Sequence, residues 1–143
     1  MNLSLTEQER LNSCDERLQK VVKKVIETWN IAVIYGYRNK AEQDKAFASG
    51  KSKLKFPASK HNTFPSSAID MLPVEVVNNR ETIDWKDRER MHYFAGFVIA
   101  TAEAMGVALR WGGDWDGDTE VKDNGFDDLA HFELKTLNTG VSI

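Results

Sequence analysis

Residues 59–72 read SKHNTFPSSAIDML, and the character of the chain changes in the middle of them. The first part contains a proline and has no regular period, so it predicts a loop. Residues 68–72, AIDML, predict a strand, in which alternation places Asp70 on the face opposite Ile69. His61, in the loop, therefore precedes by nine positions an aspartate that a strand holds in place.

The end of the chain carries a matching pattern. Residues 127–135 read DDLAHFELK, and 129–134 predict a closing strand. Alternation there places His131 and Glu133 on one face and the apolar Phe132 on the other. Two predicted strands, far apart in the sequence, thus each offer a side chain that can bind a metal ion.

The remaining patterns predict helices around a small sheet. Ser4 and Glu7 can form a capping box, and apolar residues then recur at helical spacing as far as Trp29. The further predicted elements are helices from Asn39 to about Ser49 and from Asp84 to Met105, strands at 31–35 and 107–111, and long loops at 51–67 and 112–128. This order predicts one α+β domain over residues 1–143, with a small, mostly antiparallel sheet packed against helices.

Composition and charge exclude several classes of protein. The 143 residues are 41% hydrophobic and 29% charged, as in a folded domain, and a net charge of −3 argues against nucleic-acid binding. Cys14 is the single cysteine, which excludes an internal disulfide and a multi-cysteine zinc site. The N-terminus has no signal-peptide pattern. The most apolar stretch, 93–109, is interrupted by Glu103 and is too short to span a bilayer, so we expect no membrane insertion.

Three side chains have the chemistry of a catalytic zinc site. His61, Asp70 and His131 offer two imidazoles and one carboxylate, a set that zinc takes while a fourth position stays open for water. Such an ion lowers the pKa of its water from about 15.7 to about 7. Asp128, three positions before His131, would remain free as a general base. Loop histidines and capping aspartates without a metal are the alternative, which spacing alone does not exclude.

The second predicted long loop is rich in acids. Asp114, Asp116, Asp118 and Glu120 alternate like the first positions of a calcium-binding loop, which suggests Ca²⁺ as a second ion. Gly125 stands where an EF-hand has its twelfth-position glutamate, so the stretch is not an EF-hand. A solvated acidic loop without an ion is the alternative.

Four motifs follow one another along the chain. They are Tyr37-Arg38 with Gln43 and Phe47, Ser59-x-His61 followed by Ala68-x-Asp70, Trp111-Gly-Gly-Asp-Trp115, and Asp128-x-x-His131. In this order they resemble the M15 group of zinc peptidases, which includes D-alanyl-D-alanine carboxypeptidases. The chain is most similar to the L-alanyl-D-glutamate endopeptidases that serve as phage endolysins. Three details depart from the group: the ligands of the second motif are farther apart than in its common form, the last acid is Asp rather than Glu, and the segment between Trp115 and Asp128 is longer than expected.

The resemblance implies a fold like that of the hedgehog and D-alanyl-D-alanine peptidase domains. It implies that His61, Asp70 and His131 bind Zn²⁺ and that Asp128 is the catalytic acid. Glu133 shares the face of His131 in the predicted strand, and we expect it to support that ligand.

The resemblance also suggests roles for residues around the metal. We expect Arg38 to stabilise the oxyanion or to hold a substrate carboxylate, because its planar guanidinium suits either task. A surface ion pair with Asp44 or Glu42 is the alternative. Three further residues are assigned to substrate binding: Ser59, Gln43 and Trp115.

The implied substrate is the peptide stem of peptidoglycan, cut between L-alanine and D-glutamate. Residues 51–60 contain four lysines and no acid, which suits a stem with free carboxylates but also fits a solvated basic loop. Without a signal peptide, the enzyme is expected in the host cytoplasm. It would act on the wall in the periplasm through a membrane lesion made by a separate holin. We expect a monomer without a separate wall-binding domain.

Three alternatives stay open on the sequence. A D-Ala-D-Ala-type carboxypeptidase would release D-alanine from the same kind of stem. A non-catalytic peptidoglycan-binding zinc module would have no use for Asp128. A non-haem iron oxygenase also binds its metal through two histidines and one carboxylate, but its first two ligands are closer in sequence and its barrel needs more strands.

Overall fold

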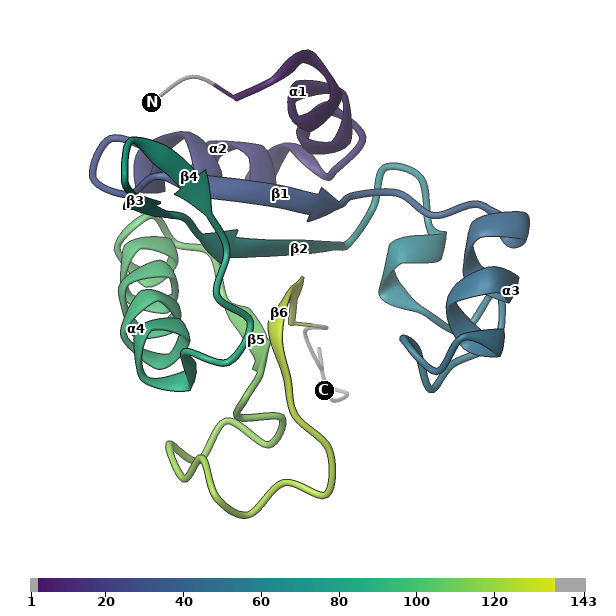
Figure 1. Cartoon of the computed structure of the whole chain (residues 1–143). Helices are drawn as coiled ribbons and strands as arrows, with labels where there is room; N and C mark the ends of the chain where they lie inside the picture. The colour runs from purple at the N-terminus through teal and green to yellow at the C-terminus, as the bar shows by residue number, and fades with distance from the viewer. Residues whose placement is uncertain (1–2, 136–143) are drawn as a thin grey trace.

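The core of the fold is an antiparallel sheet (Figure 1). The structure, a computed structural model, describes residues 3–135. Within them, the larger sheet has the order β1-β2-β6-β5, and each neighbouring pair is antiparallel. Its strands are β1 Ile31–Tyr35, β2 Ala68–Pro73, β5 Leu109–Gly112 and β6 Asp128–Leu134. The predicted small antiparallel sheet is confirmed, and its two central strands carry Asp70 and His131.

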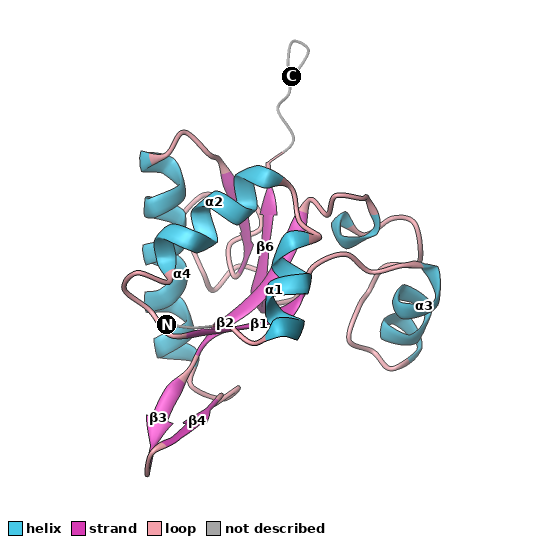
Figure 2. Ribbon diagram, turned by 90° about the horizontal axis from the view of Figure 1, so that it is seen from above, coloured by secondary structure: helices cyan, strands magenta, loops and turns pink. Residues whose placement is uncertain are grey.

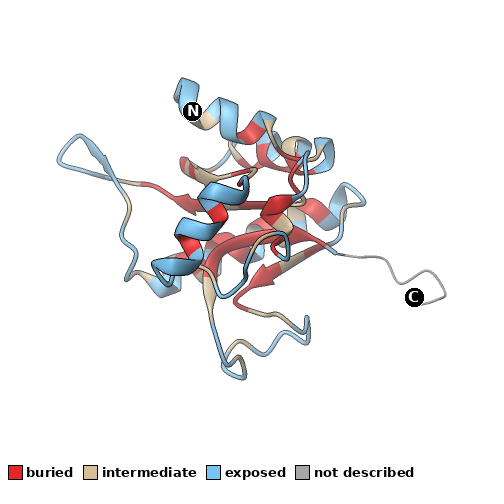
Figure 3. Cartoon of the chain, turned by 90° about the vertical axis from the view of Figure 1, so that its right-hand side faces the viewer, coloured by how far each residue is buried: buried red, intermediate tan, exposed pale blue. Residues whose placement is uncertain are grey.

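Helices cover one face of the sheet. α4 (Arg88–Ala104) packs against β2, β5 and β6, and α2 (Glu16–Val25) packs beside α4. The rings of Phe94 on α4 and Phe132 on β6 meet edge to face at 6.1 Å, and both side chains are buried. Burial of such a side chain stabilises the fold by about 1.5–3 kcal/mol. Figure 3 shows the buried residues along the strands and the exposed ones on the outer surfaces of the helices.

The N-terminal helical pattern forms two helices instead of one. α1 (Leu5–Asn12) begins with the predicted capping box of Ser4 and Glu7. The helix then ends, and Asp15 caps α2 by accepting a hydrogen bond from the backbone of Arg17. Cys14 therefore lies between two helices, where it is buried. The break lets the backbone of Asp15 donate to the carbonyl of Ser66, at 2.8 Å, and this ties the N-terminal helices to the loop before β2.

A hairpin before α4 was missed by the sequence prediction. β3 (Glu75–Val77) and β4 (Arg80–Thr82) pair with each other and stand away from the larger sheet (Figure 2). Asn78 and Asn79 both have positive φ, which is the turn conformation that joins two short strands. α4 consequently begins at Arg88 with Asp87 as its N-cap, and not at Asp84 as predicted.

The other predicted elements agree with the structure to within a few residues. α3 (Lys40–Ala48) has the predicted capping box of Asn39 and Glu42, and Gly50 follows it with φ 80°. The long loop after it contains one turn of 3-10 helix, η1 (Lys60–Asn62). No helix among the described residues combines the length and the apolar character needed to cross a bilayer.

Gly36 follows β1 and lies against the end of the N-terminal helix α1. A Cβ atom there would lie 2.1 Å from the carbonyl oxygen of Arg10 and 2.4 Å from Oγ of Ser13. The first of these atoms belongs to the backbone and cannot rotate away. The tight contact therefore requires glycine at the point where the chain leaves the sheet.

We predict that Gly36→Ala lowers the free energy of unfolding by about 1–3 kcal/mol, because the added methyl group overpacks this contact. Gly96→Ala is the control, since Gly96 is exposed inside α4 and a Cβ atom there would meet nothing within 4 Å. That change should raise stability by about 0.5–1 kcal/mol. Urea unfolding measures the free energy of unfolding of both variants. Equal values would contradict the tight contact inferred at Gly36.

Candidate metal centre

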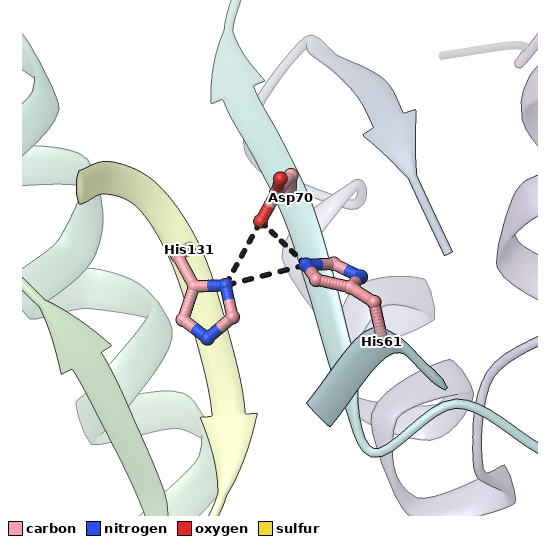
Figure 4. Close-up of side chains that lie close together, drawn as sticks. All are labelled: His61, Asp70 and His131. Carbon is pink, nitrogen blue, oxygen red and sulfur yellow. Dashed lines mark hydrogen bonds and ion pairs between the residues drawn. The ribbon is translucent and has the colours of Figure 1, made fainter. Parts of the chain in front are cut away.

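Three side chains from two distant parts of the sequence converge on one point (Figure 4). Oδ1 of Asp70 lies 3.0 Å from Nε2 of His61 and 3.1 Å from Nδ1 of His131. The two histidine nitrogens are 3.3 Å apart. The structure thus brings together the three residues that the sequence proposed as ligands.

The sheet positions two of the three. Asp70 and His131 are direct partners in the antiparallel register of β2 and β6, so their side chains emerge side by side on the same face. Phe132, the neighbour of His131, points to the opposite face and packs on α4. The group therefore lies on the face of the sheet that α4 does not cover.

His61 reaches the same point from a loop that hydrogen bonds hold in place. Oγ of Ser59 accepts the backbone N–H of His61, which caps η1. The backbone N–H of Arg38 donates to the carbonyl of His61 at 2.8 Å. Nδ2 of Asn62 donates both to the carbonyl of Arg38 and to Oε1 of Gln43. The loop is thereby fixed to the segment between β1 and α3.

The outer nitrogen of each histidine is already occupied. Nδ1 of His61 donates to the carbonyl of Gly36 at 2.7 Å, and Nε2 of His131 donates to Oε1 of Glu133 at 2.8 Å. In the neutral tautomers set by these bonds, Nε2 of His61 and Nδ1 of His131 carry lone pairs that face Asp70. Three electron-pair donors facing one another require a cation between them.

The donor set fits a zinc ion. Zinc prefers imidazole and carboxylate ligands with tetrahedral bonds of about 2.0–2.1 Å, and two ligands of such an ion are about 3.3 Å apart. The observed separations of 3.0, 3.1 and 3.3 Å are close to that edge length. The three donors can therefore occupy three corners around one ion and leave the fourth corner open.

The pKa values of Asp70 and His131 also indicate that this group favours a positive charge. Burial lowers the pKa of His131, but its hydrogen bonds with Asp70 and Glu133 outweigh burial and raise the pKa to about 9. Burial opposes ionisation of Asp70 as well, but the neighbouring His61 and His131 outweigh it and hold the pKa of Asp70 below its usual range. A proton or a metal ion between these donors satisfies the arrangement.

Glu133 extends the site beyond the three ligands. Its Oε2 accepts hydrogen bonds from Nε of Arg110, at 3.1 Å, and from Nη2 of the same guanidinium, at 3.0 Å. Arg110 also lies over the ring of Trp115, with its Cζ 5.3 Å from the ring centre. The expected support of His131 by Glu133 is present, and Arg110 fixes Glu133 in turn.

Asp70 and His131 of this group line a cavity of about 760 Å³, the site cavity. Glu133 lines it as well, together with residues of two loops. Residues of the 51–60 loop after α3 form one wall, and Trp115 with Phe126 forms part of the other. A volume of this size accommodates a short peptide.

Asp128 and Arg38 both line the site cavity. Burial raises the pKa of Asp128 to about 6; nearby Asp70 adds to the rise, and His131, His61 and Arg38 oppose it. A carboxylate tuned in this way can accept and return a proton near neutral pH.

Arg38 is only 5% exposed. Its Cζ lies 4.9 Å from the ring centre of Tyr35, and its Nε has no hydrogen-bond partner in the described part of the chain. The alternative of a surface ion pair is wrong, because Asp44 pairs with Lys40 and Glu42 caps α3. A buried guanidinium in a cavity wall is suited to an anionic group of a ligand.

The residues assigned to substrate binding separate into two kinds. Ser59 and Trp115 line the site cavity. Gln43 does not: it is fully buried, and its Nε2 donates to Oγ of Ser52 and to the carbonyl of Leu54. Gln43 therefore holds the loop that carries His61, and its assignment to substrate binding is corrected. Asn62, which completes this network, was missed because its partners are distant in sequence.

The acidic loop brings together part of the predicted calcium set. Carboxylate oxygens of Asp114, Asp116 and Asp118 lie within 4.8 Å of one another. Glu120 is not in this group, and its backbone N–H donates to Oδ1 of Asp118. A calcium ion at these residues stays a prediction.

Comparisons with known proteins agree with this architecture. The sequence profile of a family described as phage L-alanyl-D-glutamate peptidase matches residues 1–135. The crystal structure of the L-Ala D-Glu endopeptidase ChiX from Serratia marcescens has a similar fold, with a TM-score of 0.68 and 20% sequence identity. The similarity covers 94% of this chain and 90% of that one.

We predict that Glu133→Gln weakens zinc binding about 10-fold to 100-fold, because His131 loses the charged acceptor that orients its ring. Glu75→Gln is the matched control, since Glu75 pairs with Arg90 in the hairpin, away from the site. Competition with a chromogenic chelator measures the zinc affinity of both variants. Unchanged affinity in Glu133→Gln would show that this contact does not support the metal centre.

Proposed function

The chain belongs to the phage L-alanyl-D-glutamate peptidase family, and on that premise we propose that it is a zinc-dependent endolysin. It hydrolyses the bond between L-alanine and D-glutamate in the peptide stems of peptidoglycan. The observation that supports zinc dependence is the convergence of His61, Asp70 and His131 at mutual distances that match the edges of a zinc tetrahedron. These three residues would hold the ion.

Zinc held at this group would lower the pKa of a water molecule and would polarise the scissile carbonyl. Asp128, in the wall of the same cavity, takes a proton from the attacking water. As the carbon–nitrogen bond breaks, Asp128 returns that proton to the amine of D-glutamate, so that one water is consumed and no proton is gained or lost.

Arg38 faces the negative charge that develops during this reaction. Its guanidinium is buried in the cavity wall with its Nε unpaired, and so it can donate to the carbonyl oxygen as that oxygen becomes an oxyanion. Ser59 and Trp115 contact the peptide on either side. Gln43 acts indirectly, because it holds the loop that carries His61.

A second ion is proposed for the loop between β5 and β6. Asp114, Asp116 and Asp118 would offer three carboxylate ligands to Ca²⁺, and an ordered loop would keep Trp115 in the cavity wall. Calcium-dependent shifts in the amide resonances of this loop would support the ion, and their absence would refute it.

The test of the proposed function is digestion of purified Gram-negative peptidoglycan, followed by mass analysis of the products. We predict fragments with a new N-terminal D-glutamate, loss of this activity with a chelator, and its return with zinc. Release of free D-alanine would instead identify a carboxypeptidase. Restoration by iron with oxygen consumption, and not by zinc, would contradict the proposed metal chemistry.

Two variants separate catalysis from metal binding in the same assay. Asp128→Asn should keep zinc and fold but lose at least about 10²-fold in rate, because no general base remains. His131→Ala should lose both zinc and activity. Digestion of walls by Asp128→Asn at the parent rate would overturn the role of Asp128.

We further propose that the protein acts as a monomer from the host cytoplasm and depends on a separate holin to reach the periplasm. This proposal rests on the phage family to which the chain belongs. Cells that express the chain should stay intact until a pore-forming agent opens the inner membrane, and should then lyse. Asp128→Asn is the inactive control, and lysis without membrane damage would contradict the proposed route.

A further inference from the structure

Given the proposed function, we propose that Lys51 and Lys53 bind carboxylates of the D-glutamyl side of the stem and thereby select free-acid stems over amidated ones. Both lysines line the site cavity from the loop after α3. The ligand class is a peptide that carries free carboxylates on the leaving-amine side of the cleaved bond.

The cavity wall carries more basic side chains than acidic ones, and this is the first support for the inference. Its acidic members are Asp70, Asp128 and Glu133. Asp70 faces the two histidines, and Glu133 is paired with Arg110 and His131. These two acids therefore have partners within the site and do not neutralise Lys51 and Lys53.

The second support is the environment of Lys51 and Lys53. Within residues 3–135, neither lysine forms an ion pair with a carboxylate. Nζ of Lys53 lies 5.3 Å from the ring centre of Phe126, which belongs to the loop on the other side of the cavity. Lys53 is exposed, and an ammonium in a cation–π contact retains its capacity to bind an anion.

The chemistry of the stem supplies the anion. Glutamate in the stem continues the chain through its side-chain carboxyl, so its α-carboxylate is free unless it is amidated. This carboxylate is attached to the same carbon as the nitrogen released by hydrolysis. A peptide placed with its scissile bond at the metal centre therefore carries this charge, and any carboxylate farther along the leaving side, within the same cavity.

Lys53 and Lys55 form a matched pair for the test. They lie on the same loop, and each holds its ammonium over an aromatic ring, since Nζ of Lys55 lies 5.2 Å from the ring centre of Phe47. Lys53 lines the site cavity and Lys55 does not. Lys53→Gln and Lys55→Gln thus remove the same charge and the same kind of contact at two positions that differ in their access to substrate.

Two soluble stem peptides serve as substrates, one with free carboxylates on its leaving side and one with those carboxylates converted to carboxamides. We expect Lys53→Gln to raise the KM for the acid peptide about threefold to tenfold, with little change in kcat. The KM for the amide peptide should stay the same, and salt should reduce the difference between the two peptides. Lys51→Gln should act in the same direction, and Lys55→Gln should change neither KM.

The outcomes separate this inference from the proposed function. Cleavage of neither peptide by the parent chain would refute the proposed function and the inference together. Cleavage of both peptides with equal KM by the parent chain would refute the inference alone. It would also be refuted if Lys53→Gln raised both KM values equally, or if Lys55→Gln reproduced its effect, because a structural role of the loop would then explain the result.

Discussion

The site depends on the electrostatic repulsion among three electron-pair donors, which a positive charge between them relieves. Nε2 of His61, Nδ1 of His131 and Oδ1 of Asp70 lie 3.0–3.3 Å apart, and such donors are stable at this distance only around positive charge. Their positions are set from outside the group. The β2–β6 register places two of them, and the carbonyl of Gly36 with the carboxylate of Glu133 turns the histidine rings inward. A fold that lost either support would lose the site.

The charges around this group also give Asp70 and Asp128 different roles. Asp70 is surrounded by histidines and stays ionised, whereas burial raises the pKa of Asp128 to about 6. One carboxylate is therefore suited to hold a metal ion and the other to transfer a proton. Lys51 and Lys53 of the cavity wall are exposed, so they can meet a substrate that carries negative charge. Metal binding, proton transfer and substrate recognition thus use different side chains of one site.

The sequence predicted the strands well because their patterns are local. Alternation in residues 68–72 and 129–134 identified β2 and β6, and capping residues identified the starts of α1 and α3. The position of His61 could not be predicted, because it depends on hydrogen bonds to Gly36 and Arg38 across the fold. Gln43 was misassigned for the same reason: a buried amide that holds a loop and an amide that binds substrate look alike in sequence. The Asn78–Asn79 turn was local, and its positive-φ preference could have revealed the hairpin.

The central claim is that this group holds one zinc ion, and a crystal grown with one equivalent of zinc tests it most directly. Anomalous difference maps on both sides of the zinc absorption edge locate the ion without reference to activity. The account predicts a single peak about 2.0–2.2 Å from the facing donor atoms of His61, Asp70 and His131. A peak at another group of residues, or no peak among these three side chains, would contradict it.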